Sequence, residues 1–153
     1  MKASLRPAAR DDLPAISALH AASARAAFGH IAPFARFEPV DWGPALEAAD
    51  CALVAEDDGG VVGFIFTRGC EVRVFYTHPR VWGRGFGLAL LERGEDAMRD
   101  AGCEEAFLYT EERNHRPLRI YEGAGWHPDG AVKEREWLGV PIRELRLAKP
   151  LLE

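Results

Sequence analysis

The feature that most constrains this sequence is a change of hydrophobic period across a glycine-rich segment. From Cys51 to Thr77 apolar residues recur with the period of strands, and Asp-Asp-Gly-Gly at 57–60 interrupts them as a turn. Gly83, Gly85 and Gly87 then precede an apolar stripe at helical spacing, formed by Leu90, Leu91, Gly94, Ala97, Met98 and Ala101. The chain must therefore fold so that a glycine loop joins a group of antiparallel strands to a helix.

The remaining segments predict a mixed order of strands and helices. In chain order we expect a strand at 3–6, a helix from about 13 to 28, irregular pieces at 29–50, strands at 51–56, 61–67 and 71–77, the glycine loop and its helix, a strand at 106–110, a short helix between Asn114 and Gly125, and strands at 133–138 and 142–148. This order is typical of an α/β or α+β fold, with one central sheet on which the helices pack.

The composition indicates one domain over residues 1–153. Hydrophobic residues make up 48% and charged residues 28%, and the net charge of −5 argues against a nucleic-acid-binding surface. No apolar run reaches the ~18 residues of a membrane helix. Three cysteines, at 51, 70 and 103, include no C-x-x-C pair, so we expect neither a disulfide framework nor a zinc site. The expected protein is cytoplasmic, with reduced thiols and no metal.

The glycine loop has the composition of an anion site. Alternate glycines at a helix N-terminus let backbone N–H groups face outward together, where the helix dipole also favours negative charge. Arg80 and Arg84 add positive charge, so a phosphate or diphosphate is the expected ligand group. A plain glycine-rich turn is the alternative. The loop matches neither G-x-x-x-x-G-K-[ST] nor the G-x-G-x-x-G of dinucleotide-binding folds.

Two segments resemble the GNAT N-acetyltransferases. Residues 75–79 (Phe-Tyr-Thr-His-Pro) followed by 83–91 resemble the acetyl-CoA signature [QR]-x-x-G-x-[GA], in which Gly85 and Gly87 take the last two defined positions. Trp82 departs from it, because the first position is usually Gln or Arg. Residues 114–126 resemble the family's N-x-x-A-x-x-F-Y-E-x-x-G-F segment, with Pro117 and Ile120 in place of Ala and Phe.

The resemblance implies a fold and a co-substrate. The fold is a central, mostly antiparallel twisted sheet with helices on both faces, and the co-substrate is acetyl-CoA. Its diphosphate would rest on the amides of residues 83–88. Its pantetheine arm would lie along a splayed, bulged strand, expected around residues 75–77, whose free N–H groups stabilise the oxyanion. The expected cofactor-binding residues are Phe75, Tyr76, Thr77, Trp82, Gly83, Arg84, Gly85, Phe86, Gly87, Leu88, Asn114 and Tyr121. For Asn114, capping of its helix is an equal alternative.

The resemblance also implies direct acetyl transfer to an amine. Tyr121 matches the family's general acid, since a phenol with a pKa near ~10 stays protonated at neutral pH and can supply a proton to the departing thiolate. A packed core tyrosine is the alternative. An ammonium must lose a proton before it attacks, and Glu71 is the first candidate base and Glu111 the second. For either residue taken alone, a solvated surface carboxylate is the favoured alternative.

The irregular segment holds the candidate acceptor site. Phe28, Phe34, Phe37 and Trp42 could bind the apolar body of an amine, or could form a small core of their own. The resemblance implies that the acceptor is a primary amine of a small molecule or a peptide. The sequence leaves open whether the protein forms a homodimer.

Two other functions stay open. A non-catalytic acyl-CoA-binding regulatory module would keep the fold without turnover, and the departure at Trp82 keeps it open. A dinucleotide-dependent oxidoreductase is disfavoured by the glycine spacing.

Overall fold

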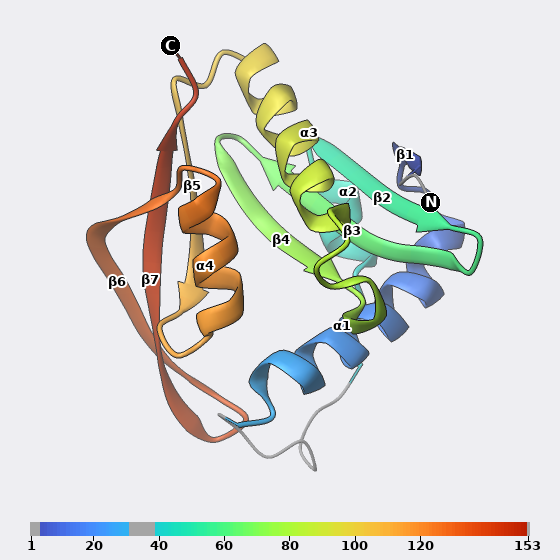
Figure 1. Cartoon of the computed structure of the whole chain (residues 1–153), viewed down its shortest axis with the longest axis horizontal. Coiled ribbons are helices and arrows are strands. Elements are labelled where there is room, and N and C mark those ends of the chain that lie inside the picture. The colour runs from blue at the N-terminus through green and yellow to red at the C-terminus, as the bar shows by residue number, and fades with distance from the viewer. Residues whose placement is uncertain (1–3, 31–38, 153) are drawn as a thin grey trace.

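A computed structural model describes residues 4–30 and 39–152 of the chain (Figure 1). Its strands are β1 (Ser4–Pro7), β2 (Cys51–Asp57), β3 (Gly60–Arg68), β4 (Glu71–Thr77), β5 (Glu105–Glu111), β6 (His127–Trp137) and β7 (Val140–Pro150). Its α-helices are α1 (Leu13–Phe28), α2 (Gly43–Ala48), α3 (Phe86–Asp100) and α4 (His115–Gly123).

The strands form one seven-stranded sheet in the order β1-β2-β3-β4-β5-β7-β6. Neighbouring strands in the sheet are antiparallel, except β4 and β5, which run parallel to each other. The mixed α/β fold with a mostly antiparallel sheet is therefore confirmed. Strand β4 has the predicted bounds, whereas β6 begins six residues earlier than predicted. Most of β6 is exposed, and its start contains Pro128 and Gly130, so its sequence lacks the hydrophobic alternation that marks a strand.

Two hydrophobic cores cover the two faces of the sheet. Helices α1 and α2 pack on one face, where Ile16, Leu19 and Phe64 are buried. Helices α3 and α4 pack on the other, where Leu90, Leu91, Tyr121 and Trp126 are buried. A Cβ at Gly94 would lie 2.7 Å from Ile65 Cδ1, so a glycine is required for α3 to approach β3 this closely. The sheet is thus a wall with a helix pair on each side.

The sheet divides between β4 and β5. Among the described residues these two strands pair at one position, Glu71 with Phe107, and the Phe107 N–H donates to the Cys70 carbonyl at 3.0 Å. Beyond this join the strands separate, and Figure 1 shows α4 beside the separation. A bulge adds one residue to β4, because Phe66 pairs with Val74 while Thr67 pairs with Val72. The splayed, bulged strand was predicted, but the extra residue is Arg73, two positions before the expected segment 75–77.

A disulfide joins Cys70 to Cys103, with 5.8 Å between their Cα atoms. The prediction that no disulfide forms is therefore wrong. Cys70 lies in the turn between β3 and β4, and Cys103 in the loop between α3 and β5. These two connections meet because β4 and β5 begin side by side, a contact that cysteine spacing does not reveal. Cys51 keeps a free thiol.

Candidate active site

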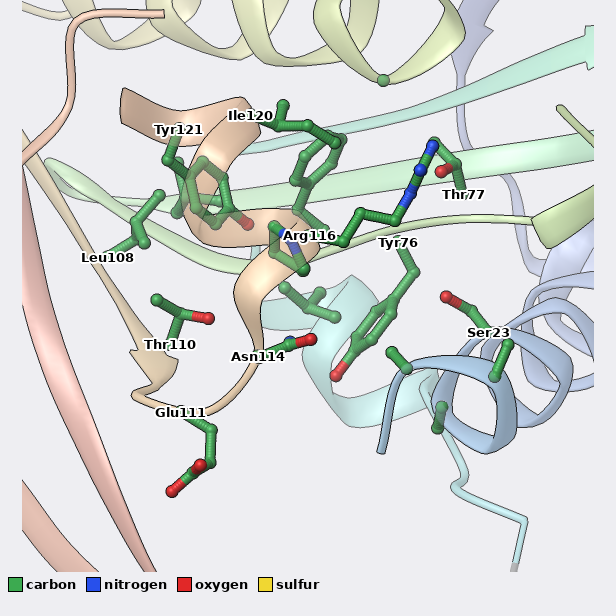
Figure 2. A pocket seen from close by; sticks show the side chains of 18 of the residues that line it. Ser23, Tyr76, Thr77, Leu108, Thr110, Glu111, Asn114, Arg116, Ile120 and Tyr121 are labelled. Carbon is green, nitrogen blue, oxygen red and sulfur yellow. The ribbon is translucent and has the colours of Figure 1, made fainter. Parts of the chain in front are cut away.

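A cavity of about 1200 Å³ occupies the separation between β4 and β5. Figure 2 shows side chains from four elements directed into it: Ser23 from α1, Tyr76 and Thr77 from β4, Leu108 and Thr110 from β5, and Arg116 and Tyr121 from α4, with Asn114 just before α4. The glycine loop closes one end through Gly83, Gly85 and Gly87. The cavity therefore brings together the two segments that carry the sequence motifs.

Alternation along the strands gives this cavity two sides. Tyr76 packs with the core under α1 and α2, whereas Phe75 packs with the core under α3 and α4. On β5, Leu108 belongs to the α3/α4 core, so Tyr109 and Glu111 face the α1 side. We call these halves the α4 side and the α1 side. The gap between β4 and β5 connects them.

The glycine loop presents a group of open backbone donors on the α4 side. Gly83 and Gly85 have φ angles of +80° and +86°, which glycine adopts readily. Among the described residues, the N–H groups of Gly83, Gly85, Phe86, Gly87 and Leu88 donate to no protein acceptor. They lie at the N-terminus of the 15-residue helix α3, where the dipole adds positive potential. A Cβ at Gly83 or Gly85 would meet nothing within 4 Å, so the space beside these amides is open to an anion.

Arg80 was expected to add positive charge to the glycine loop, but its guanidinium forms an ion pair with Asp57 instead. Its guanidinium donates to both carboxylate oxygens of Asp57, at 2.6 and 2.9 Å. This contact lowers the pKa of Asp57 to about 2. Arg84 remains the cation inside the loop, and Arg116, 4.5 Å above the Trp82 ring, lies beside it. The Trp82 indole donates to the Thr77 carbonyl at 3.1 Å, so this departure from the family signature ties the loop to β4.

The edge of β4 that faces the gap carries free main-chain donors. The His78 N–H donates to the Val62 carbonyl at 2.7 Å, which makes these residues a hydrogen-bonded pair between β4 and β3. Because such pairs alternate in an antiparallel ladder, the N–H groups of Phe75 and Thr77 point away from β3. They face the gap, where β5 does not pair with them.

Tyr121 lies on the α4 side with 7% of its surface exposed. Burial, and then the charge of Tyr76, raise the pKa of its phenol above the usual value, so it keeps its proton at neutral pH. Its ring centroid is 6.1 Å from that of Phe75 on β4. Asn114, at the start of α4, is buried and lines the cavity, and its side chain makes no capping bond to the helix.

Of the two candidate bases, Glu111 lines the cavity and Glu71 does not. Glu71 is at the closed end of the β4–β5 gap, 3.5 Å from Arg73, and does not line the cavity. Glu111 lines the α1 side, but its carboxylate accepts from the Arg113 backbone N–H and Nε, both at 2.9 Å, and from the Arg143 N–H at 2.8 Å. Burial opposes its ionisation, yet these donors outweigh burial and hold the pKa of Glu111 below its usual value. In Figure 2 its carboxylate points away from Tyr121.

A third carboxylate, Glu144, lines the same side and was not predicted. It lies on β7 directly across from Glu111 of β5, and its side chain is 18% exposed. Only the register between β5 and β7 places it there, and nothing near position 144 in the sequence marks it as a site residue.

The predicted acceptor residues are only partly described. Trp42 lines the α1 side, where its ring lies 5.0 Å from His20 and 5.7 Å from Phe64. Phe34, Phe37 and the side chain of Phe28 lie outside the described residues. His20 and Tyr76 join Trp42 in this aromatic wall, with 4.7 Å between their ring centroids. Burial lowers the pKa of His20 to about 4, so the imidazole is neutral at neutral pH.

A profile of the acetyltransferase (GNAT) family matches residues 13–126. The chain belongs to the GNAT acetyltransferase family. A mycothiol acetyltransferase of Propionibacterium freudenreichii is 40% identical over 83 residues, which are 48% of this chain and 27% of that protein. The chain thus spans about a quarter of the length of this relative. Family membership assigns the domain to acetyl-CoA-dependent acetyl transfer, with acetyl-CoA as co-substrate.

Solved structures of the family have the same fold. A GCN5-related N-acetyltransferase from Rhodopseudomonas palustris gives a TM-score of 0.84 at 18% identity, over 98% of this chain and 96% of that one. YncA from Salmonella typhimurium, solved with its cofactor acetyl-CoA, gives 0.77 at 22% identity, over 100% and 96% of the two chains. In residues 4–30 and 39–152 we find no group of side chains that could hold a metal ion, and no helix suited to crossing a membrane.

Proposed function

We propose that this protein transfers the acetyl group of acetyl-CoA to a primary amine of a small molecule or a peptide. One observation carries the proposal: five open main-chain donors at the N-terminus of α3 and a protonated tyrosine, Tyr121, line the same cavity. Diphosphate and thioester are the groups that such an arrangement fits.

The residues on the α4 side divide the work of holding acetyl-CoA. The loop amides of Gly83 and of 85–88 receive the diphosphate, and Arg84 adds charge. The free edge of β4 hydrogen-bonds the pantetheine arm through its main chain, in the way that a sheet edge binds an added strand. Leu88 and Ile120, exposed at 45% and 40%, offer apolar surface beside it, and Asn114 offers an amide.

The chemical step needs an oxyanion donor and a proton donor. The outward N–H groups of Phe75 and Thr77 are available for the oxygen of the thioester carbonyl as negative charge develops on it. Tyr121 protonates the departing thiolate of CoA, and its raised pKa keeps the phenol in the donor form. The ammonium of the acceptor first gives a proton to solvent, and the neutral amine then reaches the carbonyl carbon from the α1 side through the gap. The new C–N bond forms as the C–S bond to CoA breaks. Transfer is direct, so no covalent intermediate on the protein is required.

An acceptor screen tests the proposal. Purified protein is incubated with acetyl-CoA, a thiol reagent and a panel of amines, and released CoA is recorded. Amine-dependent release with formation of the N-acetyl product is expected. Tight binding of CoA without release for any amine would contradict the proposal and identify an acyl-CoA-binding module instead.

A further inference from the structure

The α1 side of the cavity contains two carboxylates among the described residues, Glu111 and Glu144, and they differ in what already binds them. The carboxylate of Glu111 accepts four hydrogen bonds, from Arg113 and from the Arg143 N–H. Glu144 accepts one, from Arg135 Nε to Oε1 at 2.8 Å. A carboxylate can accept about four such bonds. Glu144 is therefore the carboxylate that can still receive a cation in this half of the cavity.

The position of Glu144 suits an incoming ammonium. Its charge raises the pKa of Tyr76, after the larger effect of burial, so the carboxylate acts electrostatically on the residue that lines the β4 edge of the gap. Lys133, its register neighbour on β6, holds its ammonium 3.7 Å from the Tyr109 ring centroid. Glu144 lies opposite Glu111 on the α1 side, whereas the thioester would approach from the α4 side.

The cavity as a whole is rich in arginine. Within the described parts of the chain, five arginines and two glutamates line it, although the chain has a net charge of −5; the arginines are Arg73, Arg113, Arg116, Arg119 and Arg135. Arg116 lies near the glycine loop, and Arg113 is held by Glu111. Arg135 is half exposed, with 51% of its side chain accessible, and Glu144 is its ion-pair partner. An acceptor with an ammonium alone would leave Arg135 without a counter-charge.

We propose that Glu144 binds the ammonium group of the acceptor, and that Arg135 turns from Glu144 to an anionic group carried by the same acceptor. The acceptor class is then a small zwitterion, a primary amine close to a carboxylate. The exchange keeps each charge paired, since the Glu144–Arg135 ion pair is replaced by two ion pairs with the ligand. This inference rests on the proposed acetyl transfer and adds the substrate class and the residues that select it.

The experiment compares matched acceptors and matched variants. The acceptors are L-phenylalanine with 2-phenylethylamine and L-methionine with 3-(methylthio)propylamine, pairs that differ only in the carboxylate. The variants are E144Q, E144D and R135Q, with E112Q as control, because Glu112 is an arginine-paired carboxylate next to Glu111 that does not line the cavity. The CoA affinity and melting temperature of each variant check that the fold and the α4 side are intact.

The wild-type protein is expected to release CoA with the amino acids at least about 10-fold faster than with the simple amines. We expect E144Q to lower kcat/KM by about 100-fold, mainly through KM, E144D to recover part of this loss, and E112Q to change nothing. R135Q should abolish the preference for the carboxylate-bearing acceptor.

Two results would overturn the inference and leave the proposed function standing. One is CoA release with simple amines as fast as with amino acids. The other is E144Q within two-fold of wild type on every acceptor. If CoA binds but none of the four acceptors causes its release, both the inference and the proposed transfer to small amines fail. The proposed function and the inference are thus tested separately.

Discussion

Tyr76 and Tyr121 belong to opposite faces of the sheet, yet each lines the same cavity. Tyr76 packs with the core under α1 and α2, and Tyr121 with the core under α3 and α4. The pKa of Tyr121 is raised by burial and, to a smaller extent, by ionisation of the Tyr76 phenol. The gap between β4 and β5 allows this interaction, because paired strands would separate the two phenols. A reaction in this gap can therefore receive one substrate from each face.

The proton-donor role of Tyr121 predicts the effect of removing one oxygen atom. Tyr121→Phe should lower kcat by about 100-fold while the dissociation constant of CoA stays the same, since the ring still packs against Phe75. Steady-state kinetics and calorimetric titration with CoA measure the two quantities. Unchanged turnover would show that the phenol only fills the core.

The glycine loop can be tested with two substitutions of the same kind. Gly85→Ala and Gly60→Ala both place a side chain at positive φ, +86° and +112°, where the added Cβ meets nothing within 4 Å. Each should lose about 1–2 kcal/mol of stability from backbone strain. Only Gly85→Ala should weaken CoA binding, by 10-fold or more, because its methyl group occupies the space beside the open amides. Equal CoA affinities would argue against the loop as the diphosphate site.

Glu111 predicts a pH dependence of stability. Its pKa is lower in the folded protein than in the unfolded chain, so its contribution is present above the unfolded value near ~4.3 and is lost as pH falls through the folded value. Glu111→Gln should cost about 1–3 kcal/mol at pH 7, because donors from Arg113 and Arg143 lose a charged partner. Urea unfolding at pH 7 and below pH 4 measures this. The difference from wild type should shrink at the lower pH, and Glu134→Gln on exposed β6 serves as control.

The disulfide predicts a stability that depends on reductant. Cys70 and Cys103 are 33 residues apart, and opening a loop of this length costs roughly 3–4 kcal/mol in the chain-entropy description. Dithiothreitol should therefore lower the melting temperature of wild type and of Cys51→Ser equally. The double variant C70S/C103S should melt at the reduced temperature with or without reductant. A wild-type protein that is insensitive to reductant would contradict the cross-link.

The parts that the sequence predicted are those set by local chemistry. Strand β4 could be bounded because Gly69 precedes it and Pro79 follows it, and the loop at 83–87 could be located because alternate glycines before an apolar helical stripe have few other uses. The residues of α4 that line the cavity followed from a motif within one short segment. Each of these signals lies within about ten residues of chain.

The parts that it missed depend on contacts between distant segments. Glu144 reaches the cavity through the register of β7 on β5, and Cys70 meets Cys103 through the parallel start of β4 and β5. Glu111 is a strand-end carboxylate in the sequence, but the backbone N–H of Arg143, 32 residues away, binds it along with the nearby Arg113. No pattern within a single segment carries this information.

The Cys70–Cys103 disulfide lies beside the single pair of described residues through which β4 and β5 join the two halves of the sheet. From the disulfide, the seven residues of β4 extend about 20 Å to Thr77, which is followed by the glycine loop. In the proposed reaction, the cross-link therefore fixes how far β4 and β5 diverge at the opposite end, where acetyl-CoA and the acceptor would meet.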